Sequence, residues 1–203
     1  MNKICLFGAS EQGKVVKDVA ASNGRKIEVF FDDNPKREFI YDVPVYLSER
    51  IKDYQHFKFL ISIGDNRIRK IISEKIKTSF AILIDKTAIT AKSVFIDEGS
   101  VVMAGVIINA DVKIGKHVII NTAAVVEHDC KIGDFVHISP SVTITGNVSI
   151  GEGSHIGAGS VIIPNITIGK WATIGAGSII IKNIPDYAVV VGNPGKIIKY
   201  NNQ

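Results

Sequence analysis

The feature that most constrains the fold is an aliphatic residue at every sixth position through the C-terminal half of the chain. Neither an α-helix nor an alternating β-strand has a period of six, whereas a chain that turns a corner every six residues does. Three such corners make one triangular coil of eighteen residues, with the aliphatic side chains stacked inside. The series is unbroken and consists of Ile96, Val102, Ile108, Ile114, Ile120, Val126, Ile132, Ile138, Ile144, Ile150, Ile156, Ile162, Ile168, Ile174 and Ile180.

A second column of residues follows the first at a fixed spacing. Four residues after each aliphatic position stands a small or β-branched residue, from Ser100 and Val106 to Ser178 and Ile184. Such side chains fit the tight turns of a narrow prism. The sequence therefore predicts a parallel β-helix over residues 85–203, with a closing segment after about Pro185.

The first 84 residues predict an α/β domain of a different kind. A strand over Lys3–Phe7, a glycine turn, a helix over Lys14–Ala21 and a strand over Glu28–Phe31 form a Rossmann-like βαβ unit with a parallel sheet. Val43-Pro44-Val45 is expected on a loop that could close over a ligand. The expected elements after it are a third strand over Phe57–Ile63, a helix over Arg67–Lys77 with Ile68, Ile71, Ile72 and Ile76 inward, and a fourth strand over Ala81–Ile84 that leads into the β-helix.

Composition excludes several classes of function. The net charge of +4 is mild, and the basic residues form no run with interleaved aromatic residues, which disfavours a nucleic-acid-binding protein. No apolar run approaches the length of a membrane span, and the N-terminus has no signal-peptide layout. Cys5 and Cys130 are the two cysteines, both at positions expected to be buried, and free buried thiols predict a cytoplasmic protein.

The turn after the first predicted strand has features of a nucleotide site. Gly8 and Gly13 would let the backbone approach a phosphate at the helix N-terminus, and Asp32 follows the second strand where a dinucleotide fold places its ribose acid. The glycine spacing matches the dinucleotide motif only in part, because Ser10 replaces its middle glycine. A mononucleotide site at the carboxyl ends of the strands is therefore predicted. The alternative is that the glycines only allow close packing of strand and helix.

These motifs together resemble a known family. Gly8-Ala9-Ser10 with Gly13, Asp32-Asp33 and Ile63-Gly64-Asp65-Asn66, followed by a hexapeptide prism, look like the N-acetyltransferases of nucleotide-linked 4-amino sugars. The resemblance implies a left-handed β-helix, a homotrimer, acetyl-CoA as co-substrate, and active sites between subunits. Gln12 stands where many relatives have histidine. The residues that the resemblance assigns to the nucleotide-linked amino sugar are Gly8, Ser10, Gln12, Gly13, Asp32, Asp33, Gly64, Asn66 and Asn121.

His128 is the candidate catalytic residue. It stands in Glu127-His128-Asp129, at a coil position that Ala110, Gly146 and Pro164 occupy in other coils, so packing does not require a histidine there. With Asp129 orienting one ring nitrogen, the other can accept a proton near neutral pH. Transfer of an acetyl group from a thioester to an amine needs such a base and no acyl-enzyme. The family's catalytic base also falls on His128.

Other prism residues are assigned to acetyl-CoA. His137 matches a family histidine near the thioester, His155 follows one coil later, and a backbone N–H, with Gly146 as the candidate, is expected to bind the oxyanion. Gly157 and Gly175 are expected to leave a groove for pantetheine, although coil stacking alone also explains them. The closing segment resembles the family's usual ending, which covers the adenine of CoA. Gly192, Pro194 and Lys196 are therefore expected to contact CoA, and Lys182 or Lys196 could bind its phosphates.

Three alternatives accompany this prediction. A zinc site like that of prism-shaped carbonic anhydrases is disfavoured because His117, His128, His137 and His155 lack a pair five residues apart, so no metal is expected. The same machinery could acetylate a hydroxyl group of a sialic-acid-type sugar. A β-helix that binds but does not catalyse is the third possibility. The favoured function is N-acetylation of a nucleotide-linked amino sugar, of the 4-amino-4,6-dideoxy type, for surface glycan synthesis.

Overall fold

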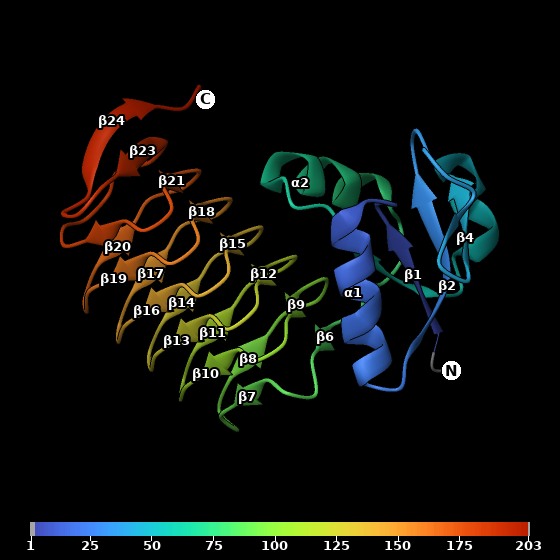
Figure 1. The fold of residues 1–203 in the computed structure, drawn as a ribbon, viewed down its shortest axis with the longest axis horizontal. Coiled ribbons are helices and arrows are strands. Elements are labelled where there is room, and N and C mark those ends of the chain that lie inside the picture. The colour runs from blue at the N-terminus through green and yellow to red at the C-terminus, as the bar shows by residue number, and fades with distance from the viewer. Residues whose placement is uncertain (1–2, 203) are drawn as a thin grey trace.

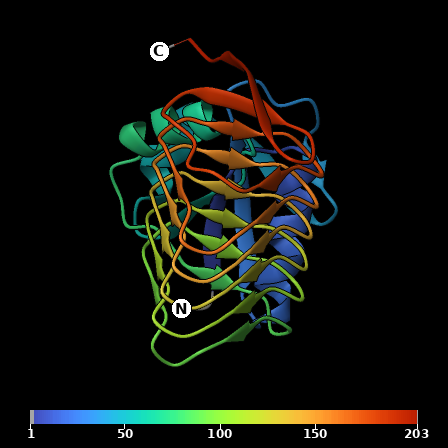
Figure 2. The ribbon, with the colours of Figure 1, turned by 90° about the vertical axis from the view of Figure 1, so that its left-hand side faces the viewer.

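The computed structural model describes residues 3–202, and it divides into the two predicted parts (Figure 1). An α/β domain lies beside the first coils of a long β-helix, and the C-terminal strands lie at the far end of that helix. Seen along another axis, the coils stack one above the next with the α/β domain behind them (Figure 2). None of the helices within residues 3–202 is long and apolar enough to cross a membrane.

The α/β domain is a five-stranded sheet in the order β3-β4-β2-β1-β5. β1 pairs in parallel with β2 and β5, and β2 pairs in parallel with β4, as the predicted βαβ unit requires. Val43–Leu47 is a strand and not a loop, because its residues 45–47 pair with the end of β2. The elements are β1 (Lys3–Phe7), α1 (Glu11–Ser22), β2 (Lys26–Asp32), β3 (Phe39–Ile40), β4 (Val43–Leu47), the 3₁₀ helix η1 (Ser48–Tyr54), β5 (Lys58–Ile61) and α2 (Asn66–Lys75).

The β-helix has three faces, each a parallel sheet of two-residue strands except at its C-terminal end. Face 1 contains β6 (Leu83–Ile84), β9 (Val101–Val102), β12 (Ile119–Ile120), β15 (His137–Ile138), β18 (His155–Ile156) and β21 (Thr173–Ile174). Face 2 contains β7 (Ile89–Thr90), β10 (Ile107–Ile108), β13 (Val125–Val126), β16 (Thr143–Ile144), β19 (Val161–Ile162) and β22 (Ile179–Ile180). Face 3 contains β8 (Phe95–Ile96), β11 (Lys113–Ile114), β14 (Lys131–Ile132), β17 (Ser149–Ile150) and β20 (Thr167–Ile168).

The sixfold aliphatic series forms the core of the prism, as predicted. The second residue of almost every strand points inward and is buried, and each strand pairs with the residues eighteen positions later, such as Ile120 with Ile138. From Gly99 to Gly177, each corner turns through a residue with positive φ, such as Gly153 and the non-glycine residues Asp129 and Trp171. The first residue of each strand therefore points outward, and these outward residues decide what each face can bind.

The C-terminal segment ends the helix with a pair of longer strands. β23 (Ala188–Val191) continues face 1 in parallel with β21, and β24 (Lys196–Tyr200) returns antiparallel to β23. The antiparallel strand covers the edge that the last coil would otherwise leave open.

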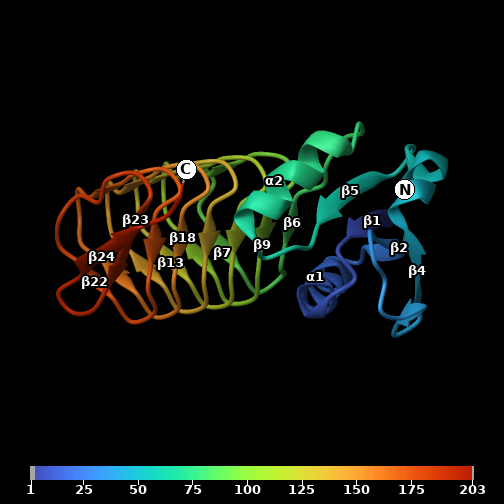
Figure 3. The same cartoon turned by 90° about the horizontal axis from the view of Figure 1, so that it is seen from above.

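The α/β domain packs on the first coils of face 1. Leu83, Val101, Met103 and Ile119 form one core cluster with residues of β1 and α1. Part of the predicted fourth strand, β6, therefore belongs to the β-helix, where it pairs with β9. In a view from above, α2 extends from the domain along the side of the coils (Figure 3).

The orientation of α2 agrees with the prediction only in part. Ile68 and Ile71 are exposed, whereas Asn66, Arg69, Ile72 and Ile76 are buried. The prediction is therefore confirmed for Ile72 and Ile76 and wrong for Ile68 and Ile71, because Asn66 and Arg69 share the buried side of the helix with Ile72 at a spacing of three residues. The reason is that this helix covers two different surfaces, one apolar and one made of backbone carbonyl groups.

His117 is buried at the contact between the two parts of the chain. Its ring stacks on Phe135 with centroids 5.2 Å apart and meets the edge of Phe80 at 4.4 Å. Its Nδ1 atom has no hydrogen-bond partner within the described residues, and a Cβ at Gly99 would collide with it. Burial, followed by the positive charge of Arg69, lowers the pKa of His117 to about 4, while Glu98 and Asp134 oppose this shift.

This burial predicts acid sensitivity. The unfolded chain takes up a proton on His117 below its ordinary pKa of about 6.5, whereas the folded chain does so only near 4, so stability is lost as the pH falls through this window. The loss attributable to His117 is at most about 3 kcal/mol. Denaturant unfolding of wild type and His117→Phe between pH 7 and pH 4 measures it, since the variant keeps a ring and cannot titrate. Equal pH dependence in the two proteins would contradict the prediction.

Candidate active site

His128 lies on the corner between face 2 and face 3, in the turn that joins β13 to β14. Its side chain is 60% exposed, and its Nδ1 is 2.8 Å from Oδ2 of Asp129. Asp129 has a φ of +62°, and this left-handed backbone conformation accompanies the return of its carboxylate toward the preceding side chain. The structure therefore pairs the two predicted catalytic residues.

The environment of His128 suits a general base. The hydrogen bond that His128 donates to Asp129, more than any other interaction, raises the pKa of His128 above its ordinary value. Because the carboxylate only accepts, Nδ1 carries a proton and Nε2 is left to receive one. The imidazole lies against Gly146 of the next coil, where a Cβ would come within 2.7 Å of Nε2. Gly146 thus makes room for the ring, and its assignment to an oxyanion remains a prediction.

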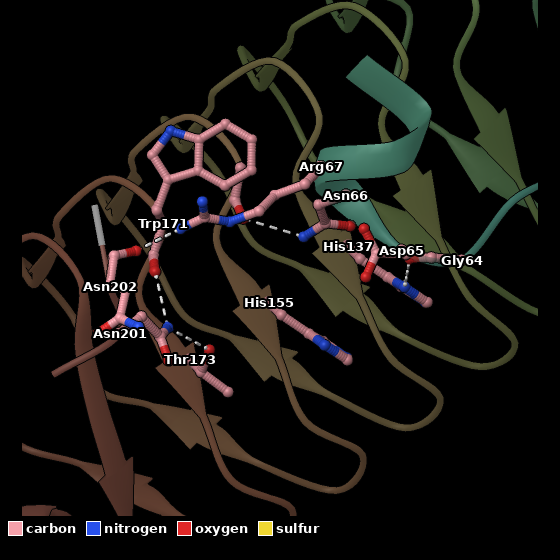
Figure 4. A pocket seen from close by; sticks show the side chains of 11 residues that line it. Gly64, Asp65, Asn66, Arg67, His137, His155, Trp171, Thr173, Asn201 and Asn202 are labelled. Carbon is pink, nitrogen blue, oxygen red and sulfur yellow. Dashed lines mark hydrogen bonds between the residues drawn. The ribbon is translucent and has the colours of Figure 1, made fainter. Parts of the chain in front are cut away.

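A second group of predicted residues lines a cavity of about 720 Å³ beside face 1. The cavity lies between the N-terminal end of α2 and the outward side chains of β15, β18 and β21 (Figure 4). His137 and His155 form its floor and stack with their ring centroids 4.8 Å apart. Trp171, Asn201 and Arg67 form part of its outer wall.

His137 is held by hydrogen bonds at both ring nitrogens. Nδ1 is 3.2 Å from the carbonyl oxygen of Gly64, and Nε2 is 3.4 Å from Nδ2 of Asn121. A carbonyl only accepts, so Nδ1 carries the proton and Nε2 accepts from Asn121. Burial lowers the pKa of His137 to about 4, and the neighbouring His155 contributes in the same direction. A neutral ring with both nitrogens engaged suits ligand contact better than proton transfer.

His155 and Asn121 have similarly fixed orientations. Nε2 of His155 is 2.8 Å from Oγ of Ser139, and burial lowers the pKa of His155. Oδ1 of Asn121 accepts from the backbone N–H of Thr122 at 2.8 Å, which directs its amide nitrogen toward His137. The predicted residues Gly64, Asn121, His137 and His155 are therefore brought together, although they come from both parts of the chain.

The predicted nucleotide-binding residues meet at the carboxyl edge of the α/β sheet. Oδ2 of Asp32 accepts from the N–H of Ala9 at 2.9 Å, so the end of β2 is tied to the turn before α1. Ser10 is exposed and makes no capping bond to α1. The expected meeting of the two glycine turns is confirmed, because Oγ of Ser62 donates to the carbonyl of Gly8 at 2.9 Å, two residues before Gly64.

Packing explains part of the glycine pattern at this edge. Gly8 has a φ of +110°, and a Cβ on Gly13 would come within 2.6 Å of the Gly8 carbonyl oxygen. Close approach of α1 to the sheet thus requires both glycines, whether or not they also face a phosphate. Nε2 of Gln12 is buried without a partner among the described residues, and Asp33 accepts from Ser48. Their contacts to a substrate stay predictions.

The assignment of residues to CoA receives mixed support from geometry. A Cβ on Gly157 would come within 2.6 Å of the backbone of Ala176, and one on Gly175 within 2.8 Å of Val191. Coil stacking therefore requires these glycines at the corner between faces 1 and 2, which favours the structural explanation for them. Gly192, Pro194 and Lys196 are exposed around the closing strands, and their contacts to adenine and phosphates stay predictions.

The two groups of site residues lie on opposite sides of one prism. Face 1 carries His137 and the α/β domain, and the corner opposite face 1 carries His128. A single chain therefore cannot bring His128 to the cavity beside Gly64. Within residues 3–202, no group of three or more His, Cys, Asp or Glu residues is placed to hold a metal ion.

Several residues around the cavity were missed from the sequence. Arg69 and Ser62 fix the turn at Gly64, and Trp171 with Asn201 limits the outer side of the cavity. Asn66, expected to contact substrate, lines the cavity and directs its amide nitrogen to the carbonyls of Gly153 and Ser154. The only sequence signal that Arg69 would be buried was its position three residues before Ile72, because residues three apart lie on the same side of a helix.

Both parts of the chain match families of known proteins. Residues 3–76 match the PglD N-terminal domain, and residues 111–146 and 147–182 match the bacterial transferase hexapeptide (six repeats). UDP-N-acetylbacillosamine N-acetyltransferase of Bacillus subtilis is 41% identical over 113 residues, which is 51% of this chain and 52% of that protein. The chain therefore spans about half the length of this curated relative.

Solved structures are similar over the whole chain. A mutant of perosamine N-acetyltransferase from Caulobacter crescentus, in complex with CoA and GDP-perosamine, is 34% identical with a TM-score of 0.94 and covers 98% of both chains. The acetyltransferase domain of PglB from Neisseria gonorrhoeae, in complex with acetyl coenzyme A, is 38% identical with a TM-score of 0.92 and covers 97% of this chain and 99% of that one. The fold, the matched domains and these similarities establish that this chain belongs to the hexapeptide-repeat nucleotide-sugar N-acetyltransferases that carry a PglD N-terminal domain.

Proposed function

We propose that the protein transfers the acetyl group of acetyl-CoA to the amine of a nucleotide-linked amino sugar, of the 4-amino-4,6-dideoxy type, for surface glycan synthesis. The observation that carries the proposal is the exposed His128–Asp129 pair, at 2.8 Å, on a chain of this family. The two similar complexes contain CoA with GDP-perosamine and acetyl coenzyme A, respectively, and so supply both substrate classes.

The chemistry follows from the position of the proton on His128. Nε2 of His128 takes a proton from the sugar amine. The amine nitrogen attacks the thioester carbonyl at the same time, and an oxyanion forms. The C–S bond then breaks, the amide remains on the sugar, and the thiolate of CoA takes up the proton. Asp129 holds the imidazole in the tautomer with Nδ1–H and stabilises the imidazolium that forms in between. His137, neutral and fixed by Gly64 and Asn121, is assigned to contact with the acetyl donor.

We further infer that the active unit is a homotrimer in which each site is shared by two chains. His128 and the cavity beside Gly64 lie on opposite sides of one prism, so a neighbouring chain must supply the base. If face 2 lies toward the threefold axis, the His128 corner of one chain meets the corner of the next chain that carries Asn121 and Ser139. Such an arrangement would complete the site.

The outward residues of face 2 support this assembly. They form a column of aliphatic side chains interrupted by one threonine, and Ile89 is 65% exposed. Face 1 is partly covered by the α/β domain, and face 3 presents the exposed Lys113 and Lys131. Burial of apolar area against a second copy of the chain favours face 2 over the other two. The column is Ile89, Ile107, Val125, Thr143, Val161 and Ile179.

An acceptor assay tests the function. Purified protein, acetyl-CoA, and UDP- or GDP-linked 4-amino-4,6-dideoxy sugars are expected to give one equivalent of free CoA thiol per acetylated sugar. The control acceptor is the same nucleotide sugar with a hydroxyl group in place of the amine, and it is expected to react far more slowly. Preference for the hydroxyl acceptor would indicate an O-acetyltransferase. Binding of acetyl-CoA without any turnover would indicate a non-catalytic protein.

A further inference from the structure

Arg69 is a buried cation that forms no ion pair with a carboxylate among residues 3–202. Its side chain is 1% exposed and lies on the side of α2 that faces the β-helix. Burial lowers the pKa of Arg69 to about 9, with Asp65 opposing this shift, so the guanidinium is still charged at neutral pH. A buried charge satisfied by carbonyls alone contributes little net stability, because desolvation offsets the hydrogen bonds. The guanidinium is therefore better explained by the groups that it positions than by a gain in stability.

The guanidinium joins backbone groups from both parts of the chain. Nε donates to the carbonyl of His117 at 2.8 Å, and Nη2 donates to the carbonyl of Phe135 at 2.7 Å, one coil later. Nη1 donates to the carbonyls of Ile63 and Gly64 at 2.9 and 3.2 Å. The planar fork therefore fixes the turn after β5 against two consecutive coils, which an ammonium group cannot do with the same geometry.

Asn66 extends the same network to a third coil. Nη2 of Arg69 donates to Oδ1 of Asn66 at 2.9 Å, and Nδ2 of Asn66 donates to the carbonyl of Gly153 at 3.0 Å. His117, Phe135 and Gly153 follow one another at intervals of one coil. The apolar contact of α1 with face 1 is not directional, whereas these hydrogen bonds allow one register of the domain along the prism axis.

The carbonyl of Gly64 links this network to the site. It accepts from both Nη1 of Arg69 and Nδ1 of His137. Ser62, two residues earlier, bonds to the carbonyl of Gly8 in the predicted nucleotide-binding turn. Any displacement of the turn at Gly64 therefore moves the nucleotide edge relative to His137.

We propose that Arg69 is a positioning residue that sets where the acceptor sugar, held by the α/β domain, meets the acetyl donor at His137. The inference rests on the proposed function. Arg69 touches neither substrate in this role. It acts through the backbone of residues 63–66 and through the coil corners at His117 and Phe135.

The kinetic test compares Arg69→Met and Arg69→Lys with Lys75→Met. Lys75 is exposed on the same helix and serves as the matched control. Arg69→Met is expected to lower kcat about hundredfold, the order expected for a displacement of about 1 Å between reacting groups. Binding of UDP or GDP, which needs only the nucleotide edge, should stay within about twofold of wild type, because that edge remains folded. Arg69→Lys should remain impaired, and Lys75→Met should behave as wild type.

Chemical rescue adds a result that a merely structural role would not give. Added guanidinium ion at millimolar concentration is expected to raise kcat of Arg69→Gly several-fold and to leave Lys75→Met unchanged. Wild-type kcat in both Arg69→Met and Arg69→Lys would overturn the proposal. If Arg69→Met does not fold, Asn66→Ala together with Arg69→Lys decides, since wild-type kcat in both of these also overturns it.

Hydrogen exchange separates this inference from the proposed function. If the wild-type protein acetylates no amino sugar, the proposed function fails, and exchange at the amides of residues 62–66 still reports on Arg69. These amides are expected to exchange faster in Arg69→Lys than in wild type or Lys75→Met, because the turn is released from the coils. Equal exchange in all three proteins would overturn the positioning role.

Discussion

Replacing His128 with alanine is expected to lower kcat for acetyl transfer about 10²- to 10⁴-fold, the usual contribution of a general base. Acetyl-CoA binding should remain as in wild type, because His128 lies on an exposed corner and its removal opens no core cavity. His56→Ala is the matched control, since His56 is also exposed and lies in the α/β domain away from both groups of site residues. Steady-state kinetics together with acetyl-CoA titration measure both quantities.

Asp129→Asn refines the same prediction through its pH profile. The base must be neutral to accept a proton, so kcat/KM falls as the pH drops below the pKa of His128. The hydrogen bond to the Asp129 carboxylate raises that pKa above its ordinary value of about 6.5, and the loss of this bond should move the acidic limb of the profile to lower pH. Wild-type kcat in His128→Ala would remove His128 as the base. An unmoved limb in Asp129→Asn would remove the role of Asp129.

Activity is expected to return when two inactive variants are combined in one trimer. His128→Ala lacks the base, and Gly64→Phe is designed to block the cavity. A Cβ at Gly64 meets no atom nearer than Cε1 of His137 at 3.9 Å, so the phenyl ring can enter the cavity with little strain on the turn. Each variant alone should be inactive. In trimers that contain both chains, about a third of the shared sites combine an intact His128 with an intact cavity.

The measurement uses chains with different affinity tags that are co-expressed and purified through both tags in succession. The specific activity of these mixed trimers is compared with that of each variant and with a mixture of the two preformed trimers. Co-expression should restore turnover, and mixing after assembly should not unless subunits exchange. Mixed trimers that contain both chains and remain inactive would show that one chain forms the whole site. A monomer in solution would contradict the shared site directly.

The repeat was predictable because its determinants are local and periodic. Each hexapeptide carries its own inward aliphatic residue and its own corner, and each coil pairs with the residues eighteen positions later, as Ile120 does with Ile138. Sequence spacing therefore fixes spatial neighbours throughout the prism. The same holds for β1, α1 and β2, where consecutive elements form one βαβ unit.

Contacts between the two parts of the chain could not be predicted in this way. Pairing between distant strands within the α/β domain was missed as well: Val43-Pro44-Val45, expected on a loop, lies in β4, which pairs with β2 on one side and β3 on the other. His117 and Phe135 lie on repeating corner positions that tolerate exposed side chains elsewhere, and only the docked α/β domain buries them. The exposure of Ile68 and Ile71 to solvent also follows from that docking.

The sequence by itself determined the two folds and their order, and it predicted His128 and Asp129 as the catalytic pair, since they are adjacent and their coil position needs no histidine for packing. Only the tertiary structure decided that Arg69, rather than an isoleucine, enters the interface, and that His137 is locked by Gly64 while His128 faces away on the opposite corner. The physical reason is that hydrogen bonds to backbone carbonyls depend on where the carbonyls lie and not on which side chains carry them. Such acceptors leave no trace in the sequence until both parts of the chain are folded and docked.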